Sequence, residues 1–163
     1  MWVTVSPSGT PVRQPCGRSP ATRHTVLVQG DHGARAVPAD LDGRVVRSID
    51  HRLDDVQREH SVRILWAVES GSRAWGFPSP DSDYDARFLF LRPTTDYLSP
   101  WLARDVIETP LDGIYDVNGW DLRKALDLMT RGNATPLEWL RSPIVYGGDP
   151  AAAAALLDLA HRI

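Results

Sequence analysis

Residues 62–91 read VRILWAVESGSRAWGFPSPDSDYDARFLFL. The apolar run over 62–68 is rich in β-forming residues, which predicts a strand. A short helix is expected over 73–77, and the Pro, Ser and Asp residues of 78–82 predict a loop. A second strand is expected over 83–91. The segment therefore predicts two strands joined by a turn, a short helix and a loop.

The second strand divides its side chains between two faces, because successive residues of a strand point in opposite directions. One face carries the apolar side chains of Tyr84, Ala86, Phe88 and Phe90. The other carries Asp83, Asp85 and Arg87. Two carboxylates in an apolar strand are unfavourable through desolvation and repulsion, and a bound divalent cation removes both effects. Oxygen ligands of this kind suit Mg²⁺, although Asp83 could instead form a turn and Asp85 could pair with Arg87.

A Gly-Ser pair, Gly71 and Ser72, follows the first strand. Gly71 has no side chain, tolerates unusual φ angles and lets the backbone approach a phosphate closely. Ser72 supplies a hydroxyl donor, and the amides that follow can bind an anion. Arg73 is expected either to contact a triphosphate or to form a surface ion pair. Together with the paired aspartates, this turn predicts a site for metal ions and phosphate groups.

A third carboxylate on a neighbouring strand would complete a clamp for two metal ions. Further strands are expected over 105–108 and 114–117, and Asp116 lies at the end of the second. Asp116 is therefore the candidate third ligand. Asp121 and Glu108 are the alternatives, although Asp121 could equally begin a helix.

Helices are expected around these strands. Apolar spacing predicts helices from about residue 47, over 119–130, from residue 135 through 140, and from residue 149 to the end. Trp139 is expected in the core of the protein, whereas Trp75 and Trp120 flank the predicted site and are candidates for base stacking.

Composition narrows the class of protein. The 163 residues carry a formal net charge of −3, so the basic footprint of a dedicated nucleic-acid binder is missing, although Lys and Arg could still cluster on one face that contacts RNA. Cys16 is the single cysteine, so neither an internal disulfide nor a CxxC zinc motif is possible. No apolar run is long enough to predict a transmembrane helix, and the first residues lack the apolar stretch of a signal peptide. A cytoplasmic location without a membrane partner is therefore expected.

Several segments resemble the DNA polymerase β-like nucleotidyltransferases. They also resemble, more narrowly, a bacterial and phage family of predicted nucleotidyltransferases, some linked to RNA repair. The matching segments are GSRAWGF (71–77), PDSDYDARF (80–88), DVNGWDLRKAL (116–126) and LEWLRSPIVY (137–146). The resemblance covers roughly residues 45–147.

The resemblance implies an α/β (α+β) nucleotidyltransferase fold, with a mixed, mostly antiparallel sheet flanked by helices. It implies two Mg²⁺ ions and a nucleoside triphosphate, whose monophosphate would move to an acceptor hydroxyl with release of pyrophosphate. The metal ligands fall on Asp83, Asp85 and Asp116. The phosphate-holding pair falls on Gly71 and Ser72, with Arg73 next to it. The acceptor stays open between RNA, a protein and a small molecule, and the oligomeric state is not predicted.

The expected domain organisation has three parts. Residues 1–45, which contain five prolines, are expected to be a poorly ordered N-terminal extension. Residues 46–147 are expected to form the nucleotidyltransferase domain, and 148–163 to begin a truncated C-terminal helical region. Because members of the superfamily use such a region for the base or the acceptor, the alternative is a non-catalytic nucleotide-binding or regulatory module.

Overall fold

The structure is a computed structural model that describes residues 27–30 and 33–163. Its strands are β1 (Leu27–Gly30), β2 (Gly33–Ala36), β3 (Arg63–Glu69), β4 (Tyr84–Leu91), β5 (Val106–Glu108), β6 (Tyr115–Asp121) and β7 (Val145–Gly148). Its helices are α1 (Gly43–His60), α2 (Gly71–Ala74), α3 (Thr94–Tyr97), α4 (Leu122–Thr130), α5 (Thr135–Leu140) and α6 (Pro150–Ala160).

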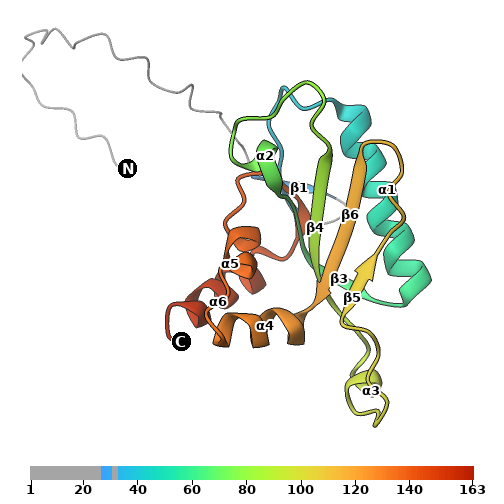
Figure 1. Ribbon diagram of the computed structural model, residues 1–163, viewed down its shortest axis with the longest axis vertical. Helices are drawn as coiled ribbons and strands as arrows, with labels where there is room; N and C mark the ends of the chain where they lie inside the picture. Colours follow the sequence, from blue (N-terminus) through green and yellow to red (C-terminus); the bar gives the residue numbers. More distant parts are fainter. Residues whose placement is uncertain (1–26, 31–32) are drawn as a thin grey trace, which may run out of the picture.

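The strands form one sheet in the order β1-β2-β7-β3-β4-β6-β5 (Figure 1). All neighbouring strands run antiparallel except β4 and β6, which are parallel. Helix α1 covers one face, and α4, α5 and α6 gather on the opposite side (Figure 1). The predicted fold class, a mixed and mostly antiparallel sheet flanked by helices, is therefore confirmed.

Two apolar cores lie on the two faces of the sheet. The first joins one stripe of α1 to inward residues of the strands, and includes Val45, Ile49, Leu53, Val56, Ala86, Phe88 and Phe90. The second lies under α4, α5 and α6, and includes Trp66, Leu89, Ala125, Trp139, Leu140 and Leu156. The predicted alternation along β4 is confirmed, because its aromatic residues face α1. On the other face, the helices cover Leu89 but leave Asp85 and Arg87 only partly buried.

Strand β6 is longer than expected. Residues 119–121, expected to begin a helix, instead continue β6 and pair with β4 on one side, while β5 pairs on the other. A Cβ atom at Gly119 would lie 2.1 Å from the Phe88 ring, so glycine is needed where the strand crosses this ring. The helix then starts at Leu122, with the Asp121 carboxylate accepting from the amide of Arg123.

The expected division of the chain into three parts stays a prediction, and the packing near its two boundaries is as follows. Strand β2 pairs with β7, so the sheet begins before residue 45. The expected disorder of residues 1–26, 31 and 32 lies outside the described residues. At the other end, α6 packs on α5 and β3 within the second core, so residue 147 does not separate two packing units. Among the described residues, no helix is long and apolar enough to cross a membrane.

Candidate functional site

Two aspartates stand side by side on the parallel strands β4 and β6. Asp85 pairs in register with Asp116, and Arg87 pairs with Asn118 two residues further along the strands. Because paired residues of neighbouring strands point to the same face, the two carboxylates share one surface. Each aspartate side chain is about a third exposed, at 31% and 30%. The predicted convergence of Asp85 and Asp116 is thus present in the fold.

Arg87 bridges the two carboxylates. Its Nη2 lies 3.0 Å from Asp85 Oδ1 and 2.6 Å from Asp116 Oδ2. Its Nη1 donates to the backbone oxygen of Asp116 at 2.9 Å. Asn118 Nδ2 donates to the remaining side-chain oxygen of Asp116. Asn118 Oδ1 is buried and has no hydrogen-bond partner among the residues that the structure describes. The pair is therefore fixed by one shared cation and one neighbouring amide.

The Gly71 turn lies directly against this pair. Gly71 has a φ of +63°, and a Cβ atom there would lie 2.3 Å from Asp85 Oδ2. The amide of Ser70 donates to the backbone oxygen of Asp85 at 2.9 Å. The first turn of α2 is thus held beside the carboxylate, and its phosphate-binding role stays a prediction.

Ser72 and Arg73 connect α2 to the loop before β4. The hydroxyls of Ser72 and Ser82 are 3.2 Å apart. Arg73 donates to the backbone oxygens of Ser82 and Asp83, and its guanidinium stacks 3.8 Å above the ring of Tyr84. These contacts make Arg73 an anchor of the loop. Its proposed contact with a triphosphate stays a prediction.

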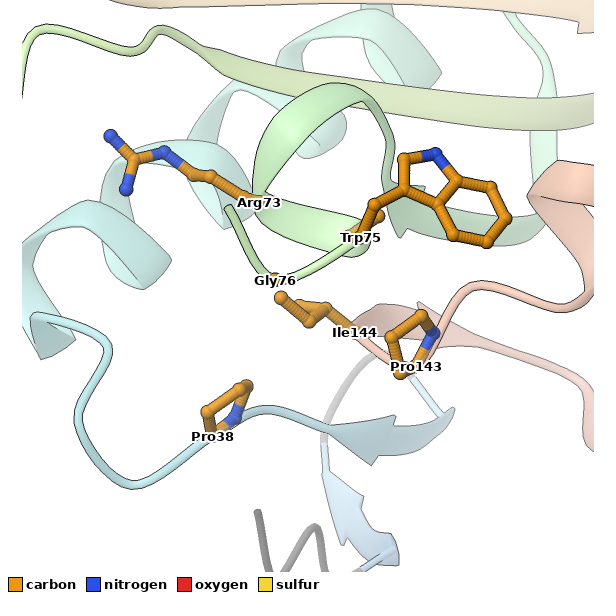
Figure 2. Close-up of a pocket in the computed structure, with 7 residues that line it drawn as sticks. Pro38, Arg73, Trp75, Gly76, Pro143 and Ile144 are labelled. Atoms are coloured by element: carbon orange, nitrogen blue, oxygen red, sulfur yellow. The ribbon is translucent and has the colours of Figure 1, made fainter. Parts of the chain in front are cut away.

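The side chains of α2 and the residue after it diverge. Figure 2 shows Arg73 and Trp75 extending to opposite sides of the turn, above a small pocket that Pro38, Pro143 and Ile144 also line. Neither Asp85 nor Asp116 lines this pocket. Trp75 is exposed, whereas the Trp120 ring packs 4.2 Å from the buried Trp139. Of these two candidates for base stacking, Trp75 is therefore the one with an accessible ring.

Asp83 stands apart from the other two aspartates. It is exposed and precedes the first residue of β4, outside the regular alternation of the strand. Within residues 27–30 and 33–163, no group of three or more His, Cys, Asp or Glu side chains lies close enough to hold a metal ion. The structure therefore assembles two of the three predicted ligands.

The alternative third ligands have other contacts. Asp121 is buried, caps α4, accepts from the Tyr97 hydroxyl and lies 3.8 Å from Arg92. Glu108 is exposed and pairs with Arg104. Asp116 is the carboxylate that lies in register with Asp85, so the geometry favours it over both.

Glu69, which the sequence analysis does not single out, is buried at the end of β3. Its carboxylate accepts from the amide of Asp85 at 3.0 Å and from the hydroxyl of Tyr146. Burial raises the pKa of Glu69 to about 7, although these two hydrogen bonds oppose the rise. The signal in the sequence is a charged residue that closes an apolar strand directly before the Gly-Ser turn.

The Asp85–Asp116 pair fits a divalent cation. One guanidinium nitrogen already lies within hydrogen-bond distance of both carboxylates, as a stand-in for a positive ion. The amide of Asn118, which contacts Asp116 through its nitrogen, also carries a buried oxygen that has no hydrogen-bond partner among the described residues. Carboxylate and amide oxygens are the donors that Mg²⁺ prefers.

Comparisons with known proteins place the chain in a family. Residues 45–163 match the RNA repair pathway DNA polymerase beta family. The uncharacterized protein YcgL of Bacillus subtilis is 51% identical over 100 residues, which cover 61% of this chain and 38% of that protein. This chain therefore spans less than half the length of that relative. No solved structure matches the chain. Because the family match includes every element from α1 to α6, the chain belongs to the RNA repair pathway DNA polymerase beta family.

Proposed function

We propose that the chain is a metal-dependent nucleotidyltransferase that moves a nucleoside monophosphate from a nucleoside triphosphate to an acceptor hydroxyl. The observation that carries the proposal is the in-register pair of Asp85 and Asp116 beside the Gly71 turn. The family match supports the reaction class. Two close carboxylates next to a glycine turn are suited to neutralising and positioning phosphate groups.

Asp85 and Asp116 would hold Mg²⁺, with Asp83 supplying a further carboxylate from the loop before β4. Bound Mg²⁺ supplies charge neutralisation on the phosphate oxygens. Gly71 and Ser72 would place the triphosphate against Asp85. The acceptor oxygen attacks the α-phosphorus, the bond from that phosphorus to the bridging oxygen breaks, and pyrophosphate leaves. Asp116 would accept the proton of the acceptor hydroxyl.

RNA is the acceptor that we propose to test first, because the family description refers to RNA repair. The net charge of −3 places any RNA contact on a local surface rather than on a generally basic protein. The single cysteine is consistent with a reducing, cytoplasmic setting, which is part of the same proposal.

The test measures pyrophosphate release from each of the four ribonucleoside triphosphates, with Mg²⁺ and an RNA that ends in a 3′ hydroxyl. The wild type is compared with Asp83→Ala/Asp85→Ala. The control is Asp127→Asn, since Asp127 pairs with Arg131 on the exposed surface of α4. Release by the wild type and the control, with loss in the double variant, is expected. Equal release by all three proteins would contradict the proposal.

A second candidate is a module that binds a nucleoside triphosphate without transferring it. It is favoured by the position of Asp83, because only two carboxylates gather at the site in the described part of the chain. Calorimetry separates the two candidates. Mg²⁺-dependent binding of the triphosphate, without pyrophosphate release to RNA, protein or small-molecule acceptors, would favour the second.

A further inference from the structure

Arg87 occupies the position between the two carboxylates. Its side chain is 18% exposed, and its guanidinium is held by three oxygens of Asp85 and Asp116. Asn118 fixes the remaining carboxylate oxygen of Asp116. The arginine is thus a component of the site and not a passing surface contact.

The bridge that Arg87 forms between the two aspartates is electrostatically favourable. Two partly buried carboxylates on adjacent strands repel one another, and a positive charge between them removes that repulsion. A guanidinium is suited to this position because its nitrogens can donate to several oxygens at once. The site therefore contains its own cation when no metal ion is bound.

A divalent cation that bridges the two aspartates through their facing oxygens would need the oxygens that Arg87 engages. Asp85 Oδ1 and Asp116 Oδ2 are both engaged by the single Nη2 atom of Arg87. A metal ion shared by these oxygens cannot lie where that nitrogen lies, and two positive charges at this spacing repel. Binding of the metal must therefore displace the guanidinium from at least one aspartate.

We propose that Arg87 is an internal counter-ion that closes the site in the free protein and moves to the triphosphate when metal and nucleotide bind together. The inference rests on the proposed function. Arg87 lies on the same face as the two aspartates, and one of them, Asp85, touches the Gly71 turn. Phosphate oxygens at that turn would therefore provide new acceptors for the released guanidinium. A metal ion alone then competes with Arg87 for the carboxylate oxygens. When a nucleotide binds with the metal ion, its phosphates take up the guanidinium and this competition is removed.

The experiment follows Mn²⁺ binding by electron paramagnetic resonance, with and without a non-hydrolysable ATP analogue. It compares the wild type with Arg87→Met, and uses Arg131→Met, an exposed arginine of an ion pair distant from the site, as control. Without nucleotide, Arg87→Met is expected to bind Mn²⁺ at least about tenfold more tightly than the wild type. With nucleotide, the variant is expected to lose affinity for the analogue, because the phosphates lose a cation.

The inference would be overturned if Arg87→Met bound Mn²⁺ no more tightly than the wild type. The proposed function would stay intact in that case, provided that both proteins bind Mn²⁺. Absence of Mn²⁺ binding to either protein, with or without nucleotide, would overturn the proposed function as well. Arg87→Gln retains amide donors for the Asp116 backbone oxygen and provides the same test if the methionine variant does not fold. The Mn²⁺ affinity of this variant is also expected to rise.

Discussion

The absence of a side chain at Gly71 makes room for the carboxylate of Asp85. A Cβ atom at this position would lie 2.3 Å from Asp85 Oδ2, a distance that no pair of unbonded atoms tolerates. Gly71 also has a φ of +63°, which side chains disfavour. Two separate constraints therefore require glycine where the turn meets the aspartate.

Gly71→Ala should damage the site through the position of Asp85. Gly76→Ala is the matched control, because Gly76 has a φ of +83° but no atom within 4 Å of its added Cβ. Both variants should lose about 1 kcal/mol from the strained backbone. Gly71→Ala should lose a further 1–3 kcal/mol or so through the clash, and its Mn²⁺ affinity should fall. Urea denaturation and Mn²⁺ titration of both variants provide the check. Equal losses of stability and of Mn²⁺ affinity in the two variants would show that Asp85 accommodates the added methyl group without harm to the site.

Asp116 and Asp121 should respond differently to substitution. Asp116→Asn should weaken Mn²⁺ binding by at least about tenfold, because it removes one of the charged ligands. Asp121→Ala should leave Mn²⁺ affinity unchanged and lower the free energy of unfolding by roughly 1–3 kcal/mol, since it removes a helix cap and the bond from Tyr97. The reverse pattern in metal titration and denaturation would make Asp121 the third carboxylate.

Glu69 should make stability depend on pH. Its pKa is raised from 4.5 to about 7 in the folded protein, chiefly by burial, so the folded state binds this proton more tightly than the unfolded chain. The contribution to stability is therefore complete below about pH 4.5 and is lost as the pH rises through about 7. The difference in pKa corresponds to roughly 3 kcal/mol.

Glu69→Gln cannot titrate and is the reference for this prediction. Urea denaturation of both proteins at pH 5 and pH 8, in the presence of a chelator, should show the wild type losing stability relative to Glu69→Gln as the pH rises. A difference between the two proteins that stays constant over this range would show that Glu69 does not gain or lose its proton there.

Arg73 should control the order of the loop before β4. Arg73→Met removes the two bonds to the backbone oxygens of Ser82 and Asp83, so amide hydrogen exchange over 78–83 should become faster. Arg104→Met is the control, because the exposed Arg104 side chain pairs with Glu108 and, among the described residues, makes no hydrogen bond or ion pair with this loop. Unchanged exchange in Arg73→Met would mean that other contacts hold the loop.

Local patterns in the sequence were sufficient to predict the central elements of the fold. Alternation along β4 separated the apolar face from Asp85 and Arg87, and the Gly-Ser pair marked the turn beside them. Local patterns could not predict which strands pair with one another, or in which register. The sequence offered Asp116, Asp121 and Glu108 as third carboxylates, and only the parallel register of β4 with β6 separates them.

Strand β7 shows a second reason why prediction falls short. Two of its four residues are glycines, which have low strand propensity. Gly148 is nevertheless required, because a Cβ atom there would lie 2.5 Å from the backbone oxygen of Leu65 on β3. The burial of Glu69 on β3 also depends on β7, because its hydrogen-bond partner Tyr146 lies on β7 and is distant from Glu69 in the sequence. Such contacts arise only when the sheet is assembled.

The central claim is that Asp85 and Asp116 together bind a divalent cation beside the Gly71 turn. It is tested most directly by a crystal structure with Mn²⁺ and a non-hydrolysable nucleoside triphosphate, with anomalous scattering recorded at the manganese edge. We expect an anomalous peak within about 2.5 Å of both carboxylates, and the triphosphate against Gly71 and Ser72. An ordered triphosphate without manganese on Asp85 or Asp116 would contradict the claim.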